Sequence, residues 1–343
     1  MLKRVLVTGA AGFIGMPLCA ELTKRGCEVT GLDDLNNFTC AAQLKVERLK
    51  QLRLDIEELS ARRVLQTGLL TFELLDLNSA AEVQSLIIDG RFDLVVHLAE
   101  LTSAQASLLS PAVYYRNNTG GFLNVLEGLR SLPVQQRPSL IFASSSAVYG
   151  TCPQGGARED DYSLLKPRSM KGATNLICER LARTYADVYG VGSVALRLFN
   201  IYGPFDRSDT LISALGRAAF GRRPLTLPEG GSALRDYLYL DDAVRALLLV
   251  GEDGTREGFE CYNLGSGVGI SQRDLVELFG ALSGQKIEIR QVPLPAAEAQ
   301  LPQLWADLTK FTARYGALPK QDLQSGLRNL IAWQQARLRE GRW

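Results

Sequence analysis

The sequence predicts an α/β protein with a doubly wound parallel sheet and a smaller C-terminal α/β lobe. Short runs rich in β-branched residues alternate with helical patterns through roughly the first 200 residues, which is typical of βαβ units. Glycine and proline are denser afterwards, as in PLPAAEAQLPQ (293–303), and this indicates a loop-rich lobe. We therefore expect a first domain over 1–198, a returning segment near 234–262, and a substrate-binding lobe over 199–343.

The expected elements follow from the apolar spacing. Strands are predicted, in chain order, at RVLVTG (4–9), CEVTGLD (27–33), LTFELLD (70–76), DLVVHLA (93–99), SLIFASS (139–145) and SVALRLFN (193–200). Apolar residues three and four apart predict helices at MPLCAELTKRG (16–26), AAEVQSLIIDG (80–90), GGFLNVLEGLR (120–130) and QSGLRNLIAWQQARL (324–338).

Charge and composition exclude several classes of partner. Lys and Arg number 38 against 37 Asp and Glu, so no broad field attracts nucleic acid or an anionic membrane. The chain starts without the apolar core of a signal peptide, and no apolar run approaches ~18 residues. The six cysteines lack CxxC or metal-ligand spacing and are interpreted as reduced thiols. We expect a cytoplasmic protein that does not span a membrane.

The glycine-rich stretch VLVTGAAGFIG joins the first strand to the first helix. Gly9, Gly12 and Gly15 let backbone N–H groups and the helix N-terminus approach a pyrophosphate, and the last glycine lets helix and strand pack closely. Phe13 and Ile14 lie inside the same turn. In this context the three glycines predict a Rossmann dinucleotide-binding site.

The second strand ends on an acidic residue, Asp33, 18 residues after Gly15. A carboxylate there accepts hydrogen bonds from the adenosine ribose hydroxyls and repels a 2′-phosphate, so we expect NAD rather than NADP. Asp76 and Leu77, at the end of the third strand, are expected beside the adenine. An alternative for Asp76 is that it caps the helix beginning near Ser79.

Two further strand ends carry polar residues where an open parallel sheet binds its ligands. After the fourth strand we expect Leu98 and Ala99 to contact the cofactor. His97 is interpreted as a buried structural residue, and as the single histidine it excludes His-based triads and multi-His metal sites. After the fifth strand, the hydroxyls of Ser144, Ser145 and Ser146 favour a substrate contact, although they could also cap a turn.

These motifs together resemble those of the extended short-chain dehydrogenase/reductase family, and within it the nucleotide-sugar epimerases, most closely the UDP-glucuronate 4-epimerases. The matching segments occur in family order and span nearly the whole chain. They are TGAAGFIG, GLDDLNNF, FDLVVHLAE, NNTGGFLNVLE, FASSSAVYG, LRLFNIYGPFDR, RDYLYLDDAV, YNLGSG and WADLTK.

The resemblance implies an activity and a set of site residues. Family members oxidise C4 of a nucleotide sugar with NAD, turn the 4-keto intermediate over, and return the hydride to the other face. It implies that Ser145 contacts the 4-hydroxyl and Ser146 the substrate, that Asn200 and Arg235 lie near the diphosphate, and that Arg207 lies near a sugar carboxylate. For Arg207 a solvated loop arginine is the alternative. The resemblance also implies a homodimer through helices near 120–130 and 178–190.

Family members carry a catalytic Tyr and Lys at i, i+4 on one helix face. Tyr162 and Lys166 have that spacing, but Lys166 precedes Pro167, which disfavours helix at Lys166. We interpret that pair as lying in a loop. The stretch PRSMKGATN instead matches the family pattern PxSxYxxxK, which puts Lys171 at the Tyr position and Asn175 at the Lys position. This sequence departs from its family at both residues.

Three hypotheses remain open from the sequence. An active epimerase could use Lys171 as the proton acceptor, if burial and the nicotinamide charge disfavour the ammonium form, or use Tyr149 or Tyr162 instead. A dehydratase or decarboxylase could start from the same bound NAD and sugar nucleotide, although Ala147 stands where those enzymes carry Glu. The protein could also bind both ligands without turnover, because function depends on the site and not on the fold.

Overall fold

The computed structural model describes residues 2–150, 156–221, 223–254, 257–293 and 303–341. Most of the stretch at 293–303 therefore lies outside the described residues. The chain forms two compact units. The first comprises 1–148, 167–197 and 244–262, and the second comprises 149–166, 198–243 and 263–343. Compared with the expected domains, the segment 149–166 belongs to the second unit, and the returning segment begins at 244 rather than near 234.

The first unit is built on an eight-stranded sheet. Its spatial order is β11 (Phe259–Leu264), β7 (Ser193–Leu198), β6 (Ser139–Ser145), β5 (Leu94–His97), β1 (Arg4–Thr8), β2 (Glu28–Asp33), β4 (Leu70–Leu74) and β3 (Val64–Thr67). All six predicted strands are present. Two strands were not predicted: β3, which pairs antiparallel with β4 at one edge of the sheet, and β11 at the other edge.

The strand order reverses at β1, which lies between β2 and β5. Val5 pairs with Val29 on one side and with Leu94 on the other, and both pairings are parallel. Because the chain leaves β1 and β5 toward opposite sides, their carboxyl ends open a crevice at this switch point. The glycine turn after β1 and the loop after β5 both lie at that edge.

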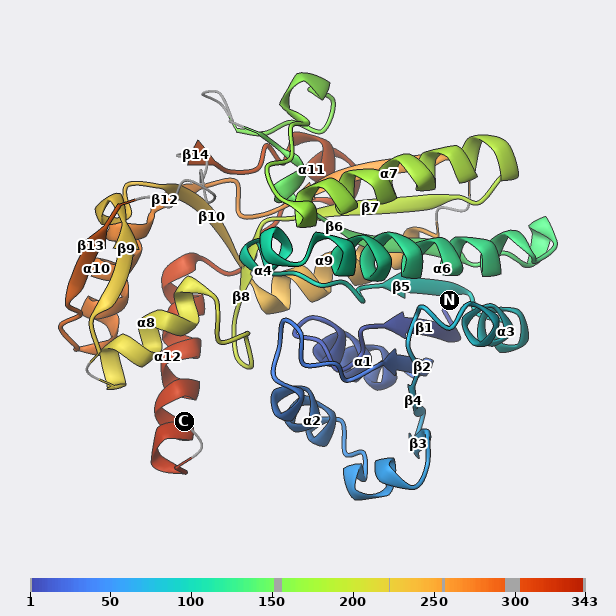
Figure 1. The fold of residues 1–343 in the computed structure, drawn as a ribbon, viewed down its shortest axis with the longest axis horizontal. Helices are drawn as coiled ribbons and strands as arrows, with labels where there is room; N and C mark the ends of the chain where they lie inside the picture. Colours follow the sequence, from blue (N-terminus) through green and yellow to red (C-terminus); the bar gives the residue numbers. More distant parts are fainter. Residues whose placement is uncertain (1, 151–155, 222, 255–256, 294–302, 342–343) are drawn as a thin grey trace. The chain divides into compact units, whose positions relative to one another are not determined.

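Helices cover both faces of this sheet, as a doubly wound fold requires (Figure 1). On one face α3 packs on α6, and α6 packs on α7. On the other, α1 packs on β2 where Cys19 approaches Gly31, and α9 packs on β5 where Gly251 approaches Leu94. The helices of this unit are α1 (Gly15–Lys24), α2 (Ala42–Gln51), α3 (Ala80–Gly90), α4 (Ala104–Leu109), α5 (Pro111–Tyr114), α6 (Gly121–Arg130), α7 (Met170–Tyr189) and most of α9 (Leu240–Asp253).

Alternation along the strands builds the core of the first unit. Val95 and Leu140 face α6 and α7, whereas their chain neighbours Leu94 and Ile141 face α9. Side chains of a strand alternate between the two faces, so nearly continuous apolar runs are needed where both faces are covered. The predicted helices at 80–90 and 120–130 supply the opposing apolar side chains, including Val83, Phe122, Val125 and Leu126.

The second unit is smaller, and its described residues combine short strands with α-helices. In its sheet β10 (Leu234–Tyr239) lies between β12 (Gly269–Ser271) and β14 (Gln303–Leu304) and also pairs with β8 (Asn200–Tyr202), while β9 (Leu225–Pro228) pairs with β13 (Ile289–Val292). Its helices are α8 (Leu211–Gly221), α10 (Gln272–Ser283), α11 (Thr309–Tyr315) and α12 (Leu323–Arg339). Leu215, Leu275, Phe279 and Leu327 are fully buried in its core.

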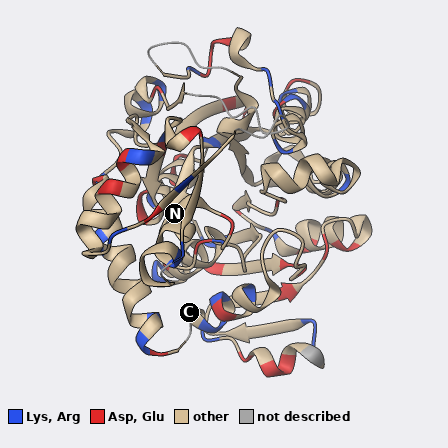
Figure 2. Ribbon diagram, turned by 60° about the vertical axis from the view of Figure 1, so that its left-hand side comes forward, with Lys and Arg blue, Asp and Glu red and all other residues tan. Residues whose placement is uncertain are grey.

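Acidic and basic residues both occur on the helices of the protein, as Figure 2 shows, in line with a formal net charge of +1. Among the described residues, no helix combines the length and the apolar character that crossing a bilayer would demand.

Candidate active site

The glycine turn after β1 is packed too closely for side chains. Gly9 has φ +73°, and a β-carbon there would lie 2.9 Å from the backbone N of Ala99. A β-carbon on Gly15 would lie 2.1 Å from the carbonyl oxygen of Gly9. The backbones of the first strand, the first helix and the loop after β5 are therefore in direct contact, as the sequence pattern predicts.

The N-terminus of α1 has the properties of an anion-binding site. Its N-cap residue, Ile14, offers no side-chain acceptor, and its first turn carries no acidic residue. The first N–H groups of a helix have no partner within the helix, and its dipole favours negative charge at this end. The turn formed by Gly12, Phe13 and Ile14 therefore fits a pyrophosphate.

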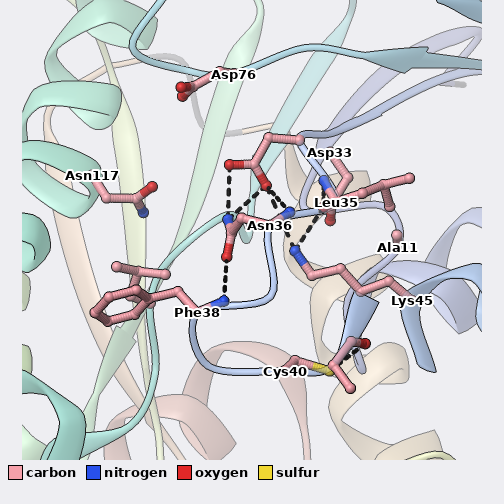
Figure 3. A network of polar contacts seen from close by, with 12 residues as sticks. Ala11, Asp33, Leu35, Asn36, Phe38, Cys40, Lys45, Asp76 and Asn117 are labelled. Carbon is pink, nitrogen blue, oxygen red and sulfur yellow. Dashed lines mark hydrogen bonds and ion pairs between the residues drawn. The ribbon is translucent and has the colours of Figure 1, made fainter. Parts of the chain in front are cut away.

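Asp33 ends β2 on the other side of this crevice and is almost fully buried. One oxygen, Oδ1, accepts a hydrogen bond from the backbone N of Leu35 at 2.9 Å and lies 2.9 Å from Nζ of Lys45 (Figure 3). The next carboxylate, Asp34, accepts from the backbone and side chain of Asn36. These contacts fix the loop after β2, in which Leu35 has φ +52°.

Asp76 lies two residues after β4 and is exposed. Its carboxylate accepts from the backbone N and Nδ2 of Asn78 at 2.9 and 2.8 Å. The helix α3 begins at Ala80 with Ser79 as its N-cap, and no side chain caps it. The alternative that Asp76 caps this helix is therefore wrong. Leu77 is buried, and a β-carbon on Gly121 would lie 2.9 Å from its Cβ.

His97 is a buried residue of the sheet, as expected. Its Nδ1 lies 2.9 Å from Oγ1 of Thr8, and the same hydroxyl accepts hydrogen bonds from the backbone N of Leu98 and Ala99 at 3.2 Å. This arrangement sets the turn that carries Leu98 and Ala99 toward the glycine loop. Burial lowers the pKa of His97 to about 4.

Acidification should therefore destabilise the protein through His97. The folded imidazole has a pKa of about 4, whereas an unfolded histidine has one near 6.5, so the unfolded state takes up the proton first. This contribution to stability is complete above about pH 6.5 and is lost as the pH falls toward 4. At pH 5 the loss in the free energy of unfolding is roughly 2 kcal/mol. Urea unfolding at pH 7 and pH 5 should show a smaller loss for His97→Gln than for the wild type.

The chain has a single histidine, so the imidazole signals in an NMR titration report this pKa directly. An imidazole that titrates near pH 6.5 in the folded protein would contradict the prediction.

The serine cluster at the end of β6 divides between two roles. The hydroxyl of Ser144 donates to Oε1 of Glu179 at 2.6 Å within the buried core, so the expectation of a substrate contact is wrong for Ser144. The hydroxyl of Ser145 accepts from the backbone N of Ala147 at 3.2 Å and closes a turn. Ser146 begins that turn and is partly exposed.

The helix α7 begins at Met170, in the register expected from PRSMKGATN. Its N-cap is Ser169, whose Oγ accepts from the backbone N of Gly172 at 3.1 Å. Lys171 is then in the first turn and Asn175 is one turn later on the same face. Asn175 is buried, and its Nδ2 donates to the carbonyl oxygen of Lys171 at 2.9 Å.

The first turn of α7 packs directly on the serine turn. A β-carbon on Gly172 would lie 2.2 Å from the carbonyl oxygen of Ala147, so only glycine permits this approach. Because Ala147 also binds the hydroxyl of Ser145, the contact brings the segment of Lys171 beside the segment of Ser145. The structure thus gathers two of the predicted catalytic residues at the carboxyl edge of the sheet.

Asn175 has a charged neighbour that sequence reasoning missed. Its Nδ2 donates to Oε2 of Glu100 at 3.1 Å, and both residues line a small cavity of about 10 Å³, which is room for about one water molecule. Glu100 follows Ala99 in the loop after β5. The amide of Asn175 is thus bound to a carboxylate.

Asn118 holds the same loop against α7. Its amide accepts from the backbone N of Leu101 at 2.8 Å and donates to the carbonyl of Leu101 at 3.1 Å and to Oγ1 of Thr174 at 3.3 Å. It lies in a π-helical turn, Tyr115–Gly120, that precedes α6. Such turns are frequent at functional sites. In the sequence, Asn118 has no spacing signal that separates it from an ordinary helical residue.

Tyr149 and Tyr162, the alternative candidates for the acid/base, lie outside α7. Tyr162 begins a short 3₁₀ turn that ends at Leu164, and its side chain is 62% exposed. Tyr149 is buried, and its hydroxyl donates to Oδ1 of Asn263 at 2.7 Å. Tyr162 and Lys166 therefore do not share a helix face.

Three predicted substrate residues belong to the second unit. Asn200 on β8 and Arg235 on β10 lie on paired strands, because Asn200 is opposite Tyr237, two residues beyond Arg235. Asn200 donates to the carbonyl of Asp236 at 2.8 Å, and burial lowers the pKa of Arg235. Arg207 makes an ion pair with Asp209, with 2.9 Å between Nε and Oδ1.

Comparison with known proteins agrees with this geometry. The model of the NAD dependent epimerase/dehydratase family matches residues 5–265. A relative from Arabidopsis thaliana, UDP-glucuronate 4-epimerase 5, is 31% identical over 96% of this chain and 74% of its own length.

Solved structures give the same result. UDP-glucuronic acid 4-epimerase from Bacillus cereus, solved with UDP-glucuronic acid and NAD, superposes with a TM-score of 0.85 at 27% identity, covering 97% of this chain and 99% of that one. MoeE5, solved with UDP-glucose and NAD, has a TM-score of 0.80 at 32% identity and covers 98% and 100% of the two chains. This chain belongs to the NAD dependent epimerase/dehydratase family.

Proposed function

We propose that this protein epimerises C4 of a UDP-linked uronic acid, with NAD bound in the first unit and Lys171 as the proton acceptor. One observation carries the assignment of the acid/base: the first turn of α7, with Lys171, packs on the turn Ser146–Val148, which directly follows Ser145. The family and the relatives described above support the reaction and the cofactor.

The residues of the first unit fit the parts of a dinucleotide. The backbone of the glycine turn and the uncapped N-terminus of α1 would hold the pyrophosphate. Asp33 would accept the adenosine ribose hydroxyls. Leu98 and Ala99 would border the nicotinamide half. When bound, NAD supplies the acceptor and the donor of the C4 hydride.

Ser145 and Lys171 would handle the proton of the 4-hydroxyl. Lys171 lies in the first turn of α7, where the positive end of the helix dipole disfavours an ammonium ion. A neutral amine there can accept the hydroxyl proton as C4 is oxidised and return it as C4 is reduced. Asn175 supplies no charge, and its buried amide instead fixes the carbonyl of Lys171 and the carboxylate of Glu100.

The second unit would bind the UDP-sugar. Arg235 is partly buried on β10, and a partly buried guanidinium suits two phosphate oxygens. Asn200, on the neighbouring strand, would contribute a polar contact near the diphosphate. Ser146 is a further proposed substrate contact. Two grounds support a uronate as the sugar: two of the relatives described above are UDP-glucuronate 4-epimerases, and Arg207 is a cation that could pair with the sugar carboxylate.

Arg207→Met should weaken the binding of UDP-glucuronate far more than that of UDP-glucose. Loss of a charge-assisted hydrogen bond should cost about 2 kcal/mol, or roughly thirtyfold in affinity, and part of this is already offset because Arg207 is paired with Asp209. Calorimetric titration of both sugar nucleotides measures the ratio. Arg290→Met, which removes an exposed arginine of β13, is the control. Equal weakening of the acid and neutral sugars would contradict the role of Arg207.

A non-catalytic protein that binds NAD and a sugar nucleotide is the second candidate. It is favoured by one observation: the amide of Asn175, bound to Glu100, stands where family members carry a lysine. A lysine at that place normally stabilises the phenolate of the neighbouring tyrosine, so that the phenolate is available at neutral pH to take a proton.

Product analysis distinguishes the two candidates. The protein is incubated with UDP-glucuronate, UDP-galacturonate, UDP-glucose or UDP-galactose, the product is identified by proton NMR, and the cofactor is followed by its absorbance at 340 nm. Interconversion of the two uronates supports the epimerase. Unchanged sugar and unchanged absorbance with both ligands bound would establish the non-catalytic protein. Conversion of the neutral sugars alone would overturn the uronate assignment.

We extend the proposal to a cytoplasmic homodimer that pairs through α6 and α7. These helices pack on each other and expose apolar side chains, among them Leu123, Ile177 and Val188. An exposed apolar surface of this kind is typical of a protein interface. Light scattering should give twice the chain mass of 37.6 kDa, and a mass of one chain would contradict the dimer.

A further inference from the structure

A cation lies directly against the carboxylate that is expected to exclude NADP. Nζ of Lys45 is 2.9 Å from Oδ1 of Asp33 and 3.6 Å from Oδ1 of Asp34. The side chains of Lys45 and Asp33 are only 12% and 6% exposed, so this pair is poorly screened by solvent. Figure 3 shows the ammonium group of Lys45 directed at the loop after β2.

The helix that carries Lys45 is fixed to the cofactor turn. Arg48, one turn further along α2 and only 1% exposed, donates from Nη1 to the carbonyl of Ala11 at 3.2 Å and lies 3.5 Å from Sγ of Cys40. Ala11 belongs to the glycine turn. The stretch of α2 that carries Lys45 is thus fixed by a buried contact of Arg48, which is separate from the ion pair of Lys45.

The balance of charge around the adenosine ribose then depends on one residue. Asp33 and Asp34 face Lys45, and the carboxylate of Asp34 is already engaged by the backbone and side chain of Asn36. Removal of Asp33 would leave the ammonium of Lys45 without its nearer partner, at the place where the ribose hydroxyls are bound. A 2′-phosphate carries nearly two negative charges and would replace that partner.

We propose that Lys45 is a latent 2′-phosphate ligand that Asp33 keeps neutralised, so that the discrimination against NADP rests on a single carboxylate. This inference rests on the proposed binding of NAD in the first unit. Asp33 repels the phosphate, and it also neutralises the ammonium group of Lys45 that would otherwise attract the phosphate. The substitution Asp33→Ser alone should therefore allow the site to bind a 2′-phosphate, without the addition of a basic residue.

Serine suits the test because it preserves the loop. The backbone N of Leu35 donates to Oδ1 of Asp33, and a serine hydroxyl can accept the same local hydrogen bond. The probes are adenosine 2′,5′-bisphosphate and AMP, which differ only in the 2′-phosphate, together with NADP and NAD. Their binding is measured by calorimetry to the wild type, Asp33→Ser, Lys45→Met and the double variant.

Asp33→Ser should tighten the binding of adenosine 2′,5′-bisphosphate relative to AMP by at least tenfold, and should shift NADP relative to NAD in the same direction. Adding Lys45→Met to Asp33→Ser should remove this gain. Adding Lys50→Met, which removes an exposed cation from the same helix, should keep it. The gain should shrink with added salt, because it is electrostatic.

Two results would overturn the proposal. One is an Asp33→Ser protein that is folded by its thermal unfolding curve, binds AMP, and shows no gain for the 2′-phosphate. The other is a gain that survives Lys45→Met. Asp33→Asn is a second variant that removes the charge with a smaller change of shape, and it must give the same direction. The assay contains no sugar nucleotide, so the proposal for Lys45 stands even if the protein proves not to be an epimerase. A wild type that binds neither AMP nor NAD would overturn both the proposal for Lys45 and the proposed function.

Discussion

Lys171→Met is expected to lower the rate of epimerisation by about 10²–10⁴-fold, which is the usual contribution of a positioned acid/base. The thioether has a similar length but cannot accept the proton of the 4-hydroxyl. The helix itself should persist, because its N-cap contact from Ser169 to Gly172 does not involve this side chain. Binding of NAD and of the sugar nucleotide, measured by calorimetry, should be nearly unchanged.

The wild-type rate should rise with pH, because only the neutral amine of Lys171 accepts a proton. This dependence should vanish from the residual activity of Lys171→Met. Tyr162→Phe is the matched control, because that tyrosine is exposed and outside α7, and it should retain the wild-type rate. A Lys171→Met protein that turns over like the wild type would show that the acid/base lies elsewhere.

Restoring the family pair tests the register of α7. Lys171→Tyr combined with Asn175→Lys would place a phenol and an ammonium at i, i+4, with the ammonium beside the carboxylate of Glu100. This protein should retain or increase epimerisation. An inactive, folded double variant that still binds both ligands would indicate that the surroundings of Asn175, and not only its own charge, differ from those of the family.

Local signals explain which parts of this site the sequence could predict. Pro167 and Ser169 mark the start of α7, and so the positions of Lys171 and Asn175 follow by counting along the chain. The glycine turn and Asp33 likewise lie at fixed distances from strand ends. In each case the signal and the residue are within one element or one connection.

The residues that were missed make contacts across the sequence. Glu100 meets Asn175 across 75 residues and Asn118 meets Thr174 across 56, and no periodicity encodes such pairs. Lys45 is only 12 residues from Asp33, but the pairing depends on how α2 packs against the glycine turn. The short strand β3 was missed because its apolar residues are few and, as the edge strand of the sheet, it pairs on one side only, with β4.

The buried ion pair behind the serine turn is expected to have a large effect on stability. Arg197 on β7 contacts both carboxylate oxygens of Glu179 on α7, at 2.9 Å from Nε and 2.7 Å from Nη2, and both side chains are less than 5% exposed. Arg197→Met should lower the free energy of unfolding by about 3–5 kcal/mol, because it leaves the carboxylate of Glu179 buried and uncompensated. Urea unfolding at pH 7 measures this loss.

Matched variants separate the charge effect from the loss of packing. Arg62→Met removes the cation of an exposed pair with Glu58 and should cost less than about 1 kcal/mol. Adding Glu179→Gln to Arg197→Met removes both charges of the buried pair and should recover part of the stability. If the double variant is no more stable than Arg197→Met, the loss comes from packing and not from an uncompensated charge.

The same pair also ties α7 to β6, because Glu179 accepts from the hydroxyl of Ser144 at 2.6 Å. Glu179 is two turns along α7 from Lys171, so a helix released from β6 and β7 would shift Lys171 relative to Ser145. We therefore expect the double variant, though partly restored in stability, to keep a reduced kcat with a nearly unchanged KM, since displacement of an acid/base affects the chemical step more than binding. A folded double variant with the wild-type kcat would limit the role of this ion pair to folding.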